Sequence, residues 1–479
     1  MATITSIGVG SGLDANSIIN ALLSVERKPI ELLQTEAKSL DAKLSSFGKI
    51  QSYLDSMRTA ATKLKTGSTW TATGATSSNT AAVTVTSSSG TSPGSYSVNV
   101  TQLASAQMTA SPGVASATTT VGQGTLRIQL GAWNTAVDDF TEKAGSSAVD
   151  ITIGPGEDTL EGIRDKINGT ADLGVKASIV NDASGSRLVL QSSTTGETNG
   201  FRVQVVGDSD LDDEDAAGLS ALAFDPETFA PASTRPQAAQ NSKATINNLP
   251  VESATNTLDN VIDGVSLKLA AQTTSAVNVT VNRDTASMKT AVQDFITAYN
   301  SLVGLLRDQT KYDAGSKSAG TLQGDRTAIT LQTQLRGLTG ATSSASSTFA
   351  RASDIGLDIQ TDGTIKLSSS KLDTALANPE ELAKFFGKVG GTSTTDGLGE
   401  RLQKLATTWT SFDGALTGRT AGLKKSMELN SDRQASLEQR ISATEARLRA
   451  QYTALDTRMA QLTGLQSYVS QQVTNWNNS

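Results

Sequence analysis

Three closely spaced glycines near the start of the chain, Gly8, Gly10 and Gly12, could approach a phosphate group through their backbone N–H groups. The surrounding residues do not support that chemistry. A dinucleotide-binding loop follows a strand and has the spacing G-x-G-x-x-G, and a P-loop ends in Gly-Lys-Ser or Gly-Lys-Thr. The stretch SIGVGSGLD meets neither condition. We interpret the three glycines as a backbone hinge, the alternative being an unstructured start without a role.

Carboxylates are the other residues that could do chemistry. The acidic run DSDLDDED at 208–215 alternates like a calcium loop, but it lacks the mid-loop glycine and the terminal glutamate that such a loop needs. A solvated loop is the favoured interpretation. A pair of carboxylates could also hydrolyse glycosides, yet no aromatic-lined sugar site accompanies them in the sequence.

Two missing residue types exclude most remaining reactions. The chain has no histidine and no cysteine, so it has no Ser-His-Asp triad, no histidine-ligated zinc, no thiol nucleophile and no disulfide. The sequence therefore predicts no catalytic residue, no metal site and no cofactor. We expect a protein that is not an enzyme.

Length and composition indicate several domains and exposed interfaces. A chain of 479 residues is long enough for about three domains of ~150 residues each. Only 4% of the residues are aromatic, so burial must rely on aliphatic side chains and on surfaces completed by other subunits. A net charge of −7 without a basic cluster argues against nucleic-acid binding. No secretory signal and no apolar run of ~20 residues is found, so we predict no membrane insertion.

The region after the glycines has the periodicity of a long helix. It predicts a helix over residues 16–65, capped by Asp14 or Asn16 and broken at Pro29. The first piece places Ile18, Ile19, Leu22 and Val25 on one face. Beyond the proline the apolar steps of three and four, with one phase shift, are typical of a coiled-coil seam: Ile30, Leu33, Ala37, Leu40, Leu44, Phe47, Ile50, Leu54, Met57, Ala61 and Leu64.

The C-terminal region carries a matching seam, formed by Leu437, Ile441, Thr444, Leu448, Tyr452, Leu455, Met459 and Leu462. Because neither long stripe can be buried by its own helix, we expect the two ends to associate after the chain has built its central domains. Residues 1–13 and those after Arg458 carry no charge, which favours helices packed on more than one side. A frayed polar tail is the alternative.

Between the two ends the periodicity changes to two, which predicts strands. The stretch VTVTSSSGTSPGSYSVNVTQL forms two strands around a Gly/Pro turn. Alternation at Ile151 and Ile153, a short helix capped by Asp158 with Glu161, and the strands VKASIV, RLVL and FRVQVV predict a small α+β unit. A second strand group follows in ATIN, VSLKLA and VNVTV.

Helices return in the last part of the central region. After Asp284 one helix is predicted from apolar steps at Met288, Val292, Phe295, Tyr299, Leu302 and Leu306. A hairpin follows with its turn at 361–363, and Asn378 caps a helix that has Pro379 at its first position.

The ordered set of motifs resembles one family, the bacterial flagellar filament capping proteins, also called flagellar hook-associated protein 2. The N-terminal stretch SIGVGSGLDANSIINALLSVERKPI and the strand motif PGSYSVNVTQLASAQ resemble the family's first half, and VDITIGPGEDTLEGIRDKIN with VKASIVND resembles its flagellin-type repeat. The second half carries, in the expected order, NTLDNVIDGVSLKL, DFITAYNSLVGLL, GTLQGDR, IGLDIQTDGTIKL and AQYTALDTRMAQLTGLQSYVSQQ.

The resemblance implies a nested, multidomain α+β fold. Terminal coiled-coil helices would form a leg domain, followed by a mostly helical body and two β-rich head domains, the distal one α+β with the flagellin-type repeat. The predicted boundaries, in that order, are 1–42 plus 430–479, 43–70 plus 285–429, 71–110 plus 237–284, and 111–236.

The resemblance also implies function and partners. The protein would be exported by the flagellar type III route, with an export chaperone, and would act outside the cell at the distal tip of the flagellum. There it would form a homo-oligomeric cap, usually described as pentameric, that promotes flagellin polymerisation, prevents loss of unpolymerised flagellin and so supports filament elongation and motility.

The two seams give this function a physical basis. Stripes that stay uncovered in the monomer can order against flagellin helices, and the cost of ordering keeps each contact weak and replaceable. We predict the filament-facing residues to be Ile18, Leu22, Leu33, Leu40, Leu448, Leu455, Met459 and Leu462, with Gly8, Gly10 and Gly12 as the hinge. For residues 47–64 packing within the chain is favoured.

Two other functions stay open at this point. A filament or junction subunit related to flagellin would form long fibres, whereas a cap would form small closed rings. An adhesin would use the β-rich head to bind host mucin or glycans, and its loss would reduce adhesion without stopping filament growth.

Overall fold

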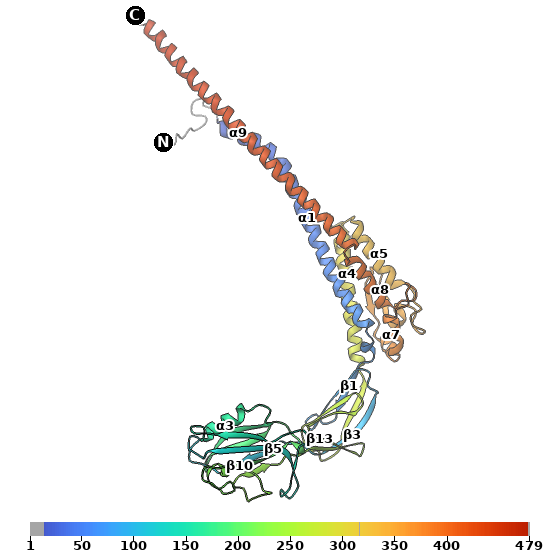
Figure 1. Cartoon of the computed structure of the whole chain (residues 1–479). Coiled ribbons are helices and arrows are strands. Elements are labelled where there is room, and N and C mark those ends of the chain that lie inside the picture. Colours follow the sequence, from blue (N-terminus) through green and yellow to red (C-terminus); the bar gives the residue numbers. More distant parts are fainter. Residues whose placement is uncertain (1–13, 316, 478–479) are drawn as a thin grey trace. The chain divides into compact units, whose positions relative to one another are not determined.

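The helical part of the molecule is built from both ends of the sequence. In the computed structural model, which describes residues 14–315 and 317–477, one unit comprises the described residues up to Trp70 together with those from Ala286 onward, and Thr71–Thr285 form the other (Figure 1). The β-rich middle of the chain is therefore inserted between two helical segments, and the nested α+β class is confirmed. The finer division into four domains stays a prediction.

The helical unit contains α1 (Ala15–Lys65), α2 (Gly67–Trp70), α4 (Thr285–Thr310), α5 (Arg326–Gly340), η3 (Ala352–Ile355), α6 (Ser369–Ala375), α7 (Pro379–Gly387), α8 (Leu398–Thr410) and α9 (Ala415–Asn477). Two hairpins join them, β17 (Tyr312–Asp313) with β18 (Ser318–Ala319) and β19 (Leu357–Ile359) with β20 (Ile365–Leu367). The second hairpin turns at the predicted place, where Gly363 has φ +89°, a backbone angle that glycine adopts without strain.

Helix α1 is continuous through Pro29, so the predicted break is wrong. The proline ring removes one hydrogen bond, the one to the carbonyl of Val25. Both residues are exposed, so water can reach that carbonyl, and the buried side chains of Leu23 and Ile30 hold the helix on either side. The cap prediction is confirmed for Asp14, whose Oδ1 accepts a hydrogen bond of 3.0 Å from the backbone N–H of Ser17.

The lower half of α1 forms the core of the body together with α4, α7 and α8. Its seam is buried at Phe47, Ile50, Leu54, Met57, Ala61 and Leu64. All six predicted apolar positions of α4 are buried as well, namely Met288, Val292, Phe295, Tyr299, Leu302 and Leu306. Trp70 stacks on Phe386 of α7 with the ring centroids 5.3 Å apart.

One half of the β-rich unit is a pair of antiparallel sheets around one core. The strands are β1 (Thr73–Ser77), β2 (Val83–Ser87), β3 (Gly94–Gln102), β12 (Ser242–Ile246), β13 (Leu249–Ser253), β14 (Thr257–Ile262), β15 (Val265–Leu269) and β16 (Val277–Arg283). They pair in the orders β1-β16-β3-β12-β13 and β14-β15-β2. The predicted strands β2 and β3 thus exist, but they lie in different sheets and enclose a common core that includes Val83, Val98 and Leu267.

The other half contains α3 (Leu160–Gly169) and two four-stranded antiparallel sheets. The strands are β4 (Met108–Ala110), β5 (Gly124–Trp133), β6 (Phe140–Glu142), β7 (Val149–Ile153), β8 (Val175–Asp182), β9 (Gly185–Ser192), β10 (Gly200–Val206) and β11 (Thr234–Gln237), with 3₁₀ turns η1 (Glu197–Asn199) and η2 (Gly218–Leu222). The cap of α3 is Thr159, not the predicted Asp158: its side chain accepts from the N–H of Gly162, because it stands at the residue that directly precedes the helix.

Candidate docking surface on the terminal helices

The ends of the described chain form an antiparallel pair of helices. Asn430 of α9 lies beside Leu33 of α1, while Arg440, further along α9, approaches Glu26, which is nearer the start of α1. The two helices lie side by side over the length of this contact (Figure 1). The predicted association of the two seams is therefore present within one chain.

A small apolar cluster closes the middle of this pair. Its buried members are Ile19, Leu23, Ile30 and Ile441, and the partly buried Leu437, Leu448 and Tyr452 pack against them. The cluster ends on α9 at Tyr452, because α1 begins at Ala15 and offers no further side chains beyond that point.

Asn430 is a buried polar residue in the same pair. Only 3% of it is exposed, and its Nδ2 donates to the carbonyl of Leu33 and to Oε2 of Glu36, both at 3.1 Å. Its Oδ1 accepts from Nε2 of Gln434 at 2.6 Å. A buried amide with specific partners favours one alignment of two helices over shifted ones.

Helix α9 then continues for about 37 Å past Tyr452, at 1.5 Å for each residue, with no described helix opposite it (Figure 1). Six apolar side chains along one face remain exposed, and we call them the distal stripe: Leu455 (42% exposed), Met459 (36%), Leu462 (60%), Leu465 (64%), Val469 (52%) and Val473 (51%). Contiguous exposed apolar surfaces are typical of interaction sites, so the distal stripe is a candidate docking surface.

The predicted site residues divide into exposed and half-buried ones. Ile18, Leu22, Leu455, Met459 and Leu462 are exposed. Leu33, Leu40 and Leu448 are half-buried, and Leu448 packs against the apolar cluster between the two helices. Gly8, Gly10 and Gly12 lie outside the described residues.

The sequence prediction was wrong about which residues near the start of α1 face inward. On α9 it left out the last exposed apolar residues. The buried residues near the start of α1 are Ala15, Ile19 and Leu23. Ile18, Leu22 and Val25 therefore point outward instead of sharing one covered face with Ile19. On α9 the prediction ended at Leu462 and omitted Leu465, Val469 and Val473. The steps of four and three continue through Val469 and Val473, so the periodicity itself could have found them.

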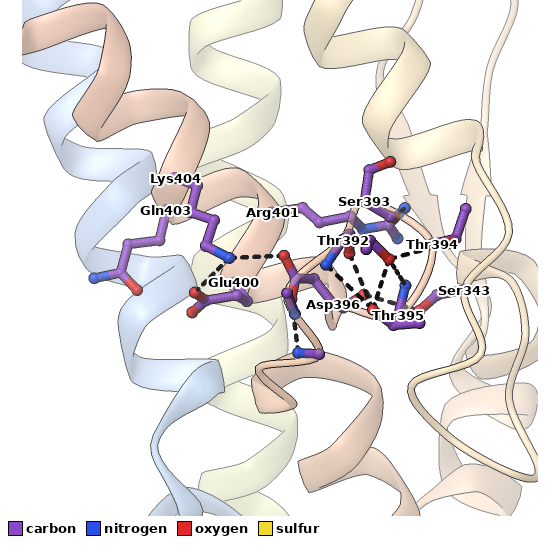
Figure 2. Close-up of polar contacts among 12 residues, drawn as sticks. Ser343, Thr392, Ser393, Thr394, Thr395, Asp396, Glu400, Arg401, Gln403 and Lys404 are labelled. Carbon is purple, nitrogen blue, oxygen red and sulfur yellow. Dashed lines mark hydrogen bonds and ion pairs between the residues drawn. The ribbon is translucent and has the colours of Figure 1, made fainter.

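A polar cluster in the body surrounds the start of α8 (Figure 2), and one of its members, Glu400, also binds the end of α1. Lys404 bonds Asp396 at 2.8 Å and Glu400 at 3.2 Å, and Lys65 at the end of α1 also pairs with Glu400. Asp396 further accepts the N–H groups of Gly390 and Gly391 at 2.7 and 2.9 Å. These contacts tie the loop before α8 and the end of α1 to one helix, so the terminal pair extends from a fixed base.

Hydrogen bonds keep the carboxylates of the body ionised. The hydrogen bond from Lys404 lowers the pKa of Asp396, although burial opposes this. The pKa of Glu381 is lowered from 4.5 to about 2 by hydrogen bonds from Lys384, Ser346 and the N–H of Ser347. Asp396 and Glu381 stabilise the body, since the hydrogen-bond partners of each carboxylate lie within it.

The acidic side chains of the described residues do not gather into a metal-binding cluster. No group of three or more acidic side chains among them converges as metal ligands would. In the acidic run, Asp208 is buried and its Oδ2 accepts from the N–H and Oγ of Ser220 at 2.8 and 2.9 Å. No helix of the described chain is long and apolar enough to cross a lipid bilayer.

Known proteins are similar to this chain over its full length. Residues 11–107 match the model of the flagellar hook-associated protein 2 N-terminus and residues 239–464 that of its C-terminus. Flagellar hook-associated protein 2 of Escherichia coli K12 is 34% identical over 100% of both chains. The chain belongs to the flagellar hook-associated protein 2 family. The family resemblance stated from the sequence is therefore confirmed.

Other members of the family agree with the fold. The B-type flagellar hook-associated protein 2 of Pseudomonas aeruginosa is 30% identical over 97% of this chain and 96% of its own. The crystal structure of the D1-D2-D3 domains of the flagellar cap protein FliD from Escherichia coli matches with a TM-score of 0.63 at 30% identity, covering 79% of this chain and 99% of that one. Residues 139–194 match the flagellin hook IN motif, which confirms the predicted flagellin-type repeat.

Proposed function

We propose that this protein caps the distal tip of a bacterial flagellar filament and that the distal stripe of α9 docks on the filament's subunits. The observation that carries the docking surface is the exposed apolar stripe beyond Tyr452, on a helix without a described partner. A relative of known structure is a flagellar cap protein, which supports the proposal that this surface acts at the filament tip.

The composition of the stripe suits a contact that must be made and broken repeatedly. Burying one exposed leucine contributes about 1.5–3 kcal/mol, so a few such side chains hold a helix in place. After Arg458 the polar positions of α9 are amides and hydroxyls without charge, so docking breaks no ion pair there. Ordering the helix on a partner opposes part of that gain, which leaves each contact replaceable as subunits are added.

The cap acts outside the cell, at the end of the flagellar export route, and works by assembly rather than by catalysis. Its proposed partners are flagellin, the flagellar export apparatus with an export chaperone, and further copies of itself in a closed ring, for which a pentamer is our prediction. Promoting flagellin polymerisation and retaining unpolymerised flagellin would support filament elongation and motility.

Deletion and complementation test this function. Without the gene, full-length flagellin should accumulate unpolymerised in the medium while hooks still form. The wild-type chain should restore filaments, but a chain with Leu455→Gln and Leu462→Gln should not. The matched control, Thr457→Gln with Ala460→Gln, places the same two glutamines on the opposite face of α9, where both residues are exposed, and should restore growth.

Two results would contradict the proposal. Filaments of normal length from the leucine variant would show that the distal stripe is not the docking surface. Long fibres formed by the purified protein alone would indicate a filament subunit instead of a cap.

The glycine hinge is tested separately. Replacing Gly8, Gly10 and Gly12 by alanine should impair filament growth while leaving self-association intact, because alanine restricts the backbone angles without adding charge or bulk. Unchanged swimming would count against a hinge.

A further inference from the structure

A groove between α5 and α8 of the body is lined by cationic and apolar side chains. Its volume is about 600 Å³, and the residues that matter for binding are Arg326, Thr330, Leu338, Arg401, Leu405 and Trp409. Leu338 and Leu405 are half-exposed, and the indole of Trp409 donates to Oε1 of Gln334 at 2.8 Å across the groove. The groove therefore has apolar walls with positive charge along them.

Arg401 is the buried cation of this groove. It is only 5% exposed, its Nε has no hydrogen-bond partner, and its one hydrogen bond goes to the carbonyl of Ser393 at 3.4 Å (Figure 2). No carboxylate of the described chain lies within 4.0 Å of its guanidinium. The nearby Asp396 is already bonded to Lys404, which also pairs with Glu400. Leaving a buried guanidinium incompletely paired is costly, so this site favours an incoming carboxylate.

The loop at 208–215 presents the complementary chemistry. Leu211 is 94% exposed, with φ +72°, between the exposed carboxylates of Asp210 and Asp212. The loop is held in this shape, because the buried Asp208 accepts from the N–H and Oγ of Ser220 and Asp210 accepts from the N–H of Asp212. A rigid loop loses little entropy on binding.

We infer that the 208–215 loop of one copy docks in the α5–α8 groove of a second copy, with Leu211 against Leu338 and Leu405 and with the flanking aspartates near Arg326 and Arg401. The inference rests on the proposed function, since it supplies a contact between neighbouring copies of the ring. Each copy carries one loop and one groove on different parts of the chain, so the contact is head-to-tail and can close a ring.

Disulfide trapping tests this contact in the full-length protein. The chain has no cysteine, so Leu211→Cys in one copy and Thr330→Cys in a differently tagged copy are the only thiols in the mixture. Thr330 is exposed and lines the groove. Oxidation should give the mixed disulfide in about tenfold excess over a control in which Leu249→Cys replaces Leu211→Cys, because docking raises the effective concentration of the thiols. Leu249 is likewise an exposed leucine of the β-rich unit, at 69%.

Reversing the charges on both sides of the contact distinguishes a lost contact from a misfolded variant. Arg326→Glu alone, or Asp210→Lys with Asp212→Lys, should reduce the trapped product about tenfold, and combining them across the two copies should restore it. Arg326 is exposed at the first residue of α5, so its replacement leaves the fold intact.

The outcomes separate this contact from the proposed function. A mixed disulfide no more abundant than the control, or a disulfide that forms only within one chain carrying both cysteines, would overturn the contact. If the contact is overturned but light scattering still shows that the wild-type protein associates, the proposed ring is not contradicted. If the wild-type protein stays monomeric at every concentration, the ring itself is contradicted.

Discussion

Two stretches of helix have the same apolar spacing, but one is buried and the other is exposed. In α1 the residues Phe47, Ile50, Leu54, Met57, Ala61 and Leu64 are fully buried in the body. In α9 Leu455, Met459, Leu462, Leu465 and Val469 follow the same steps of three and four, yet all are exposed. The spacing defines an apolar face, but what covers that face depends on which helices the rest of the chain supplies. The body supplies α4, α7 and α8, and no described element lies against the end of α9.

The comparison predicts opposite phenotypes for the same substitution in the two stretches. Leu54→Ala should lower the free energy of unfolding of the helical unit by about 3–5 kcal/mol, because it opens a cavity in a fully buried seam. Leu462→Ala should change it by less than about 0.5 kcal/mol, since the side chain is 60% exposed. Urea unfolding followed by circular dichroism measures both.

Filament growth should show the reverse order at temperatures where both variants are folded. Leu462→Ala should shorten filaments, while Leu54→Ala should support growth once folded. A large loss of stability from Leu462→Ala would mean that the distal stripe is covered within the monomer, and the distinction between the two stretches would fail.

The second prediction concerns the covered part of the pair formed by α1 and α9. Asn430→Ala should lower the free energy of unfolding by about 1–2 kcal/mol, because the Nδ2 hydrogen bonds to Leu33 and Glu36 are lost from a buried position. It should also speed amide hydrogen exchange over residues 15–40 of α1, where the helix pair loses its fixed alignment. The control is Gln434→Ala, which removes only the outer hydrogen bond to Asn430 and should have a smaller effect. Equal effects of the two variants would contradict a special role for Asn430.

Much of the fold follows from local sequence signals. Periodicity predicted α1, α4 and the upper part of α9, and turn residues predicted the hairpin around Gly363. The break at Pro29 was wrong because tertiary contacts at Leu23 and Ile30 outweigh one lost hydrogen bond that water can replace. The separation of β2 and β3 into two sheets depends on β15 and β16, which lie more than 150 residues later, and no local pattern reveals that pairing.

The candidate site was only partly predictable for a related reason. The sequence prediction placed Ile18 and Ile19 on one broad apolar face, although adjacent residues of a helix point about 100° apart. Only the position of α9 decides that Ile19 is covered and Ile18 is not. Arg401 carries no sequence signal at all. Its significance depends on burial beside α5 without a carboxylate partner, which is a property of packing.

Acid should also affect the body and the end of α9 differently. The pKa of Glu381 is lowered to about 2, so its hydrogen bonds stabilise the body fully above about pH 4.5, and this contribution is lost as the pH falls towards 2. Glu381→Gln should therefore flatten the decrease in stability between about pH 4.5 and 2. The end of α9 has no acidic or basic side chain after Arg458, so its helicity should not follow the same transition. Circular dichroism of the whole chain, with hydrogen exchange resolved by segment, measures both.

The smallest predicted effect lies on α9 just before the distal stripe. Arg449 pairs with Glu445 one turn earlier at 2.8 Å, and about half of the arginine side chain is exposed. Such a pair contributes about 0.3–0.5 kcal/mol, so Glu445→Gln should shift the urea midpoint only slightly and leave filament growth unchanged. If Glu445→Gln instead stopped filament growth as Leu462→Ala is expected to do, polar contacts along α9 would govern docking. The difference between the covered and the uncovered stretch would then lie in charge and not in apolar surface.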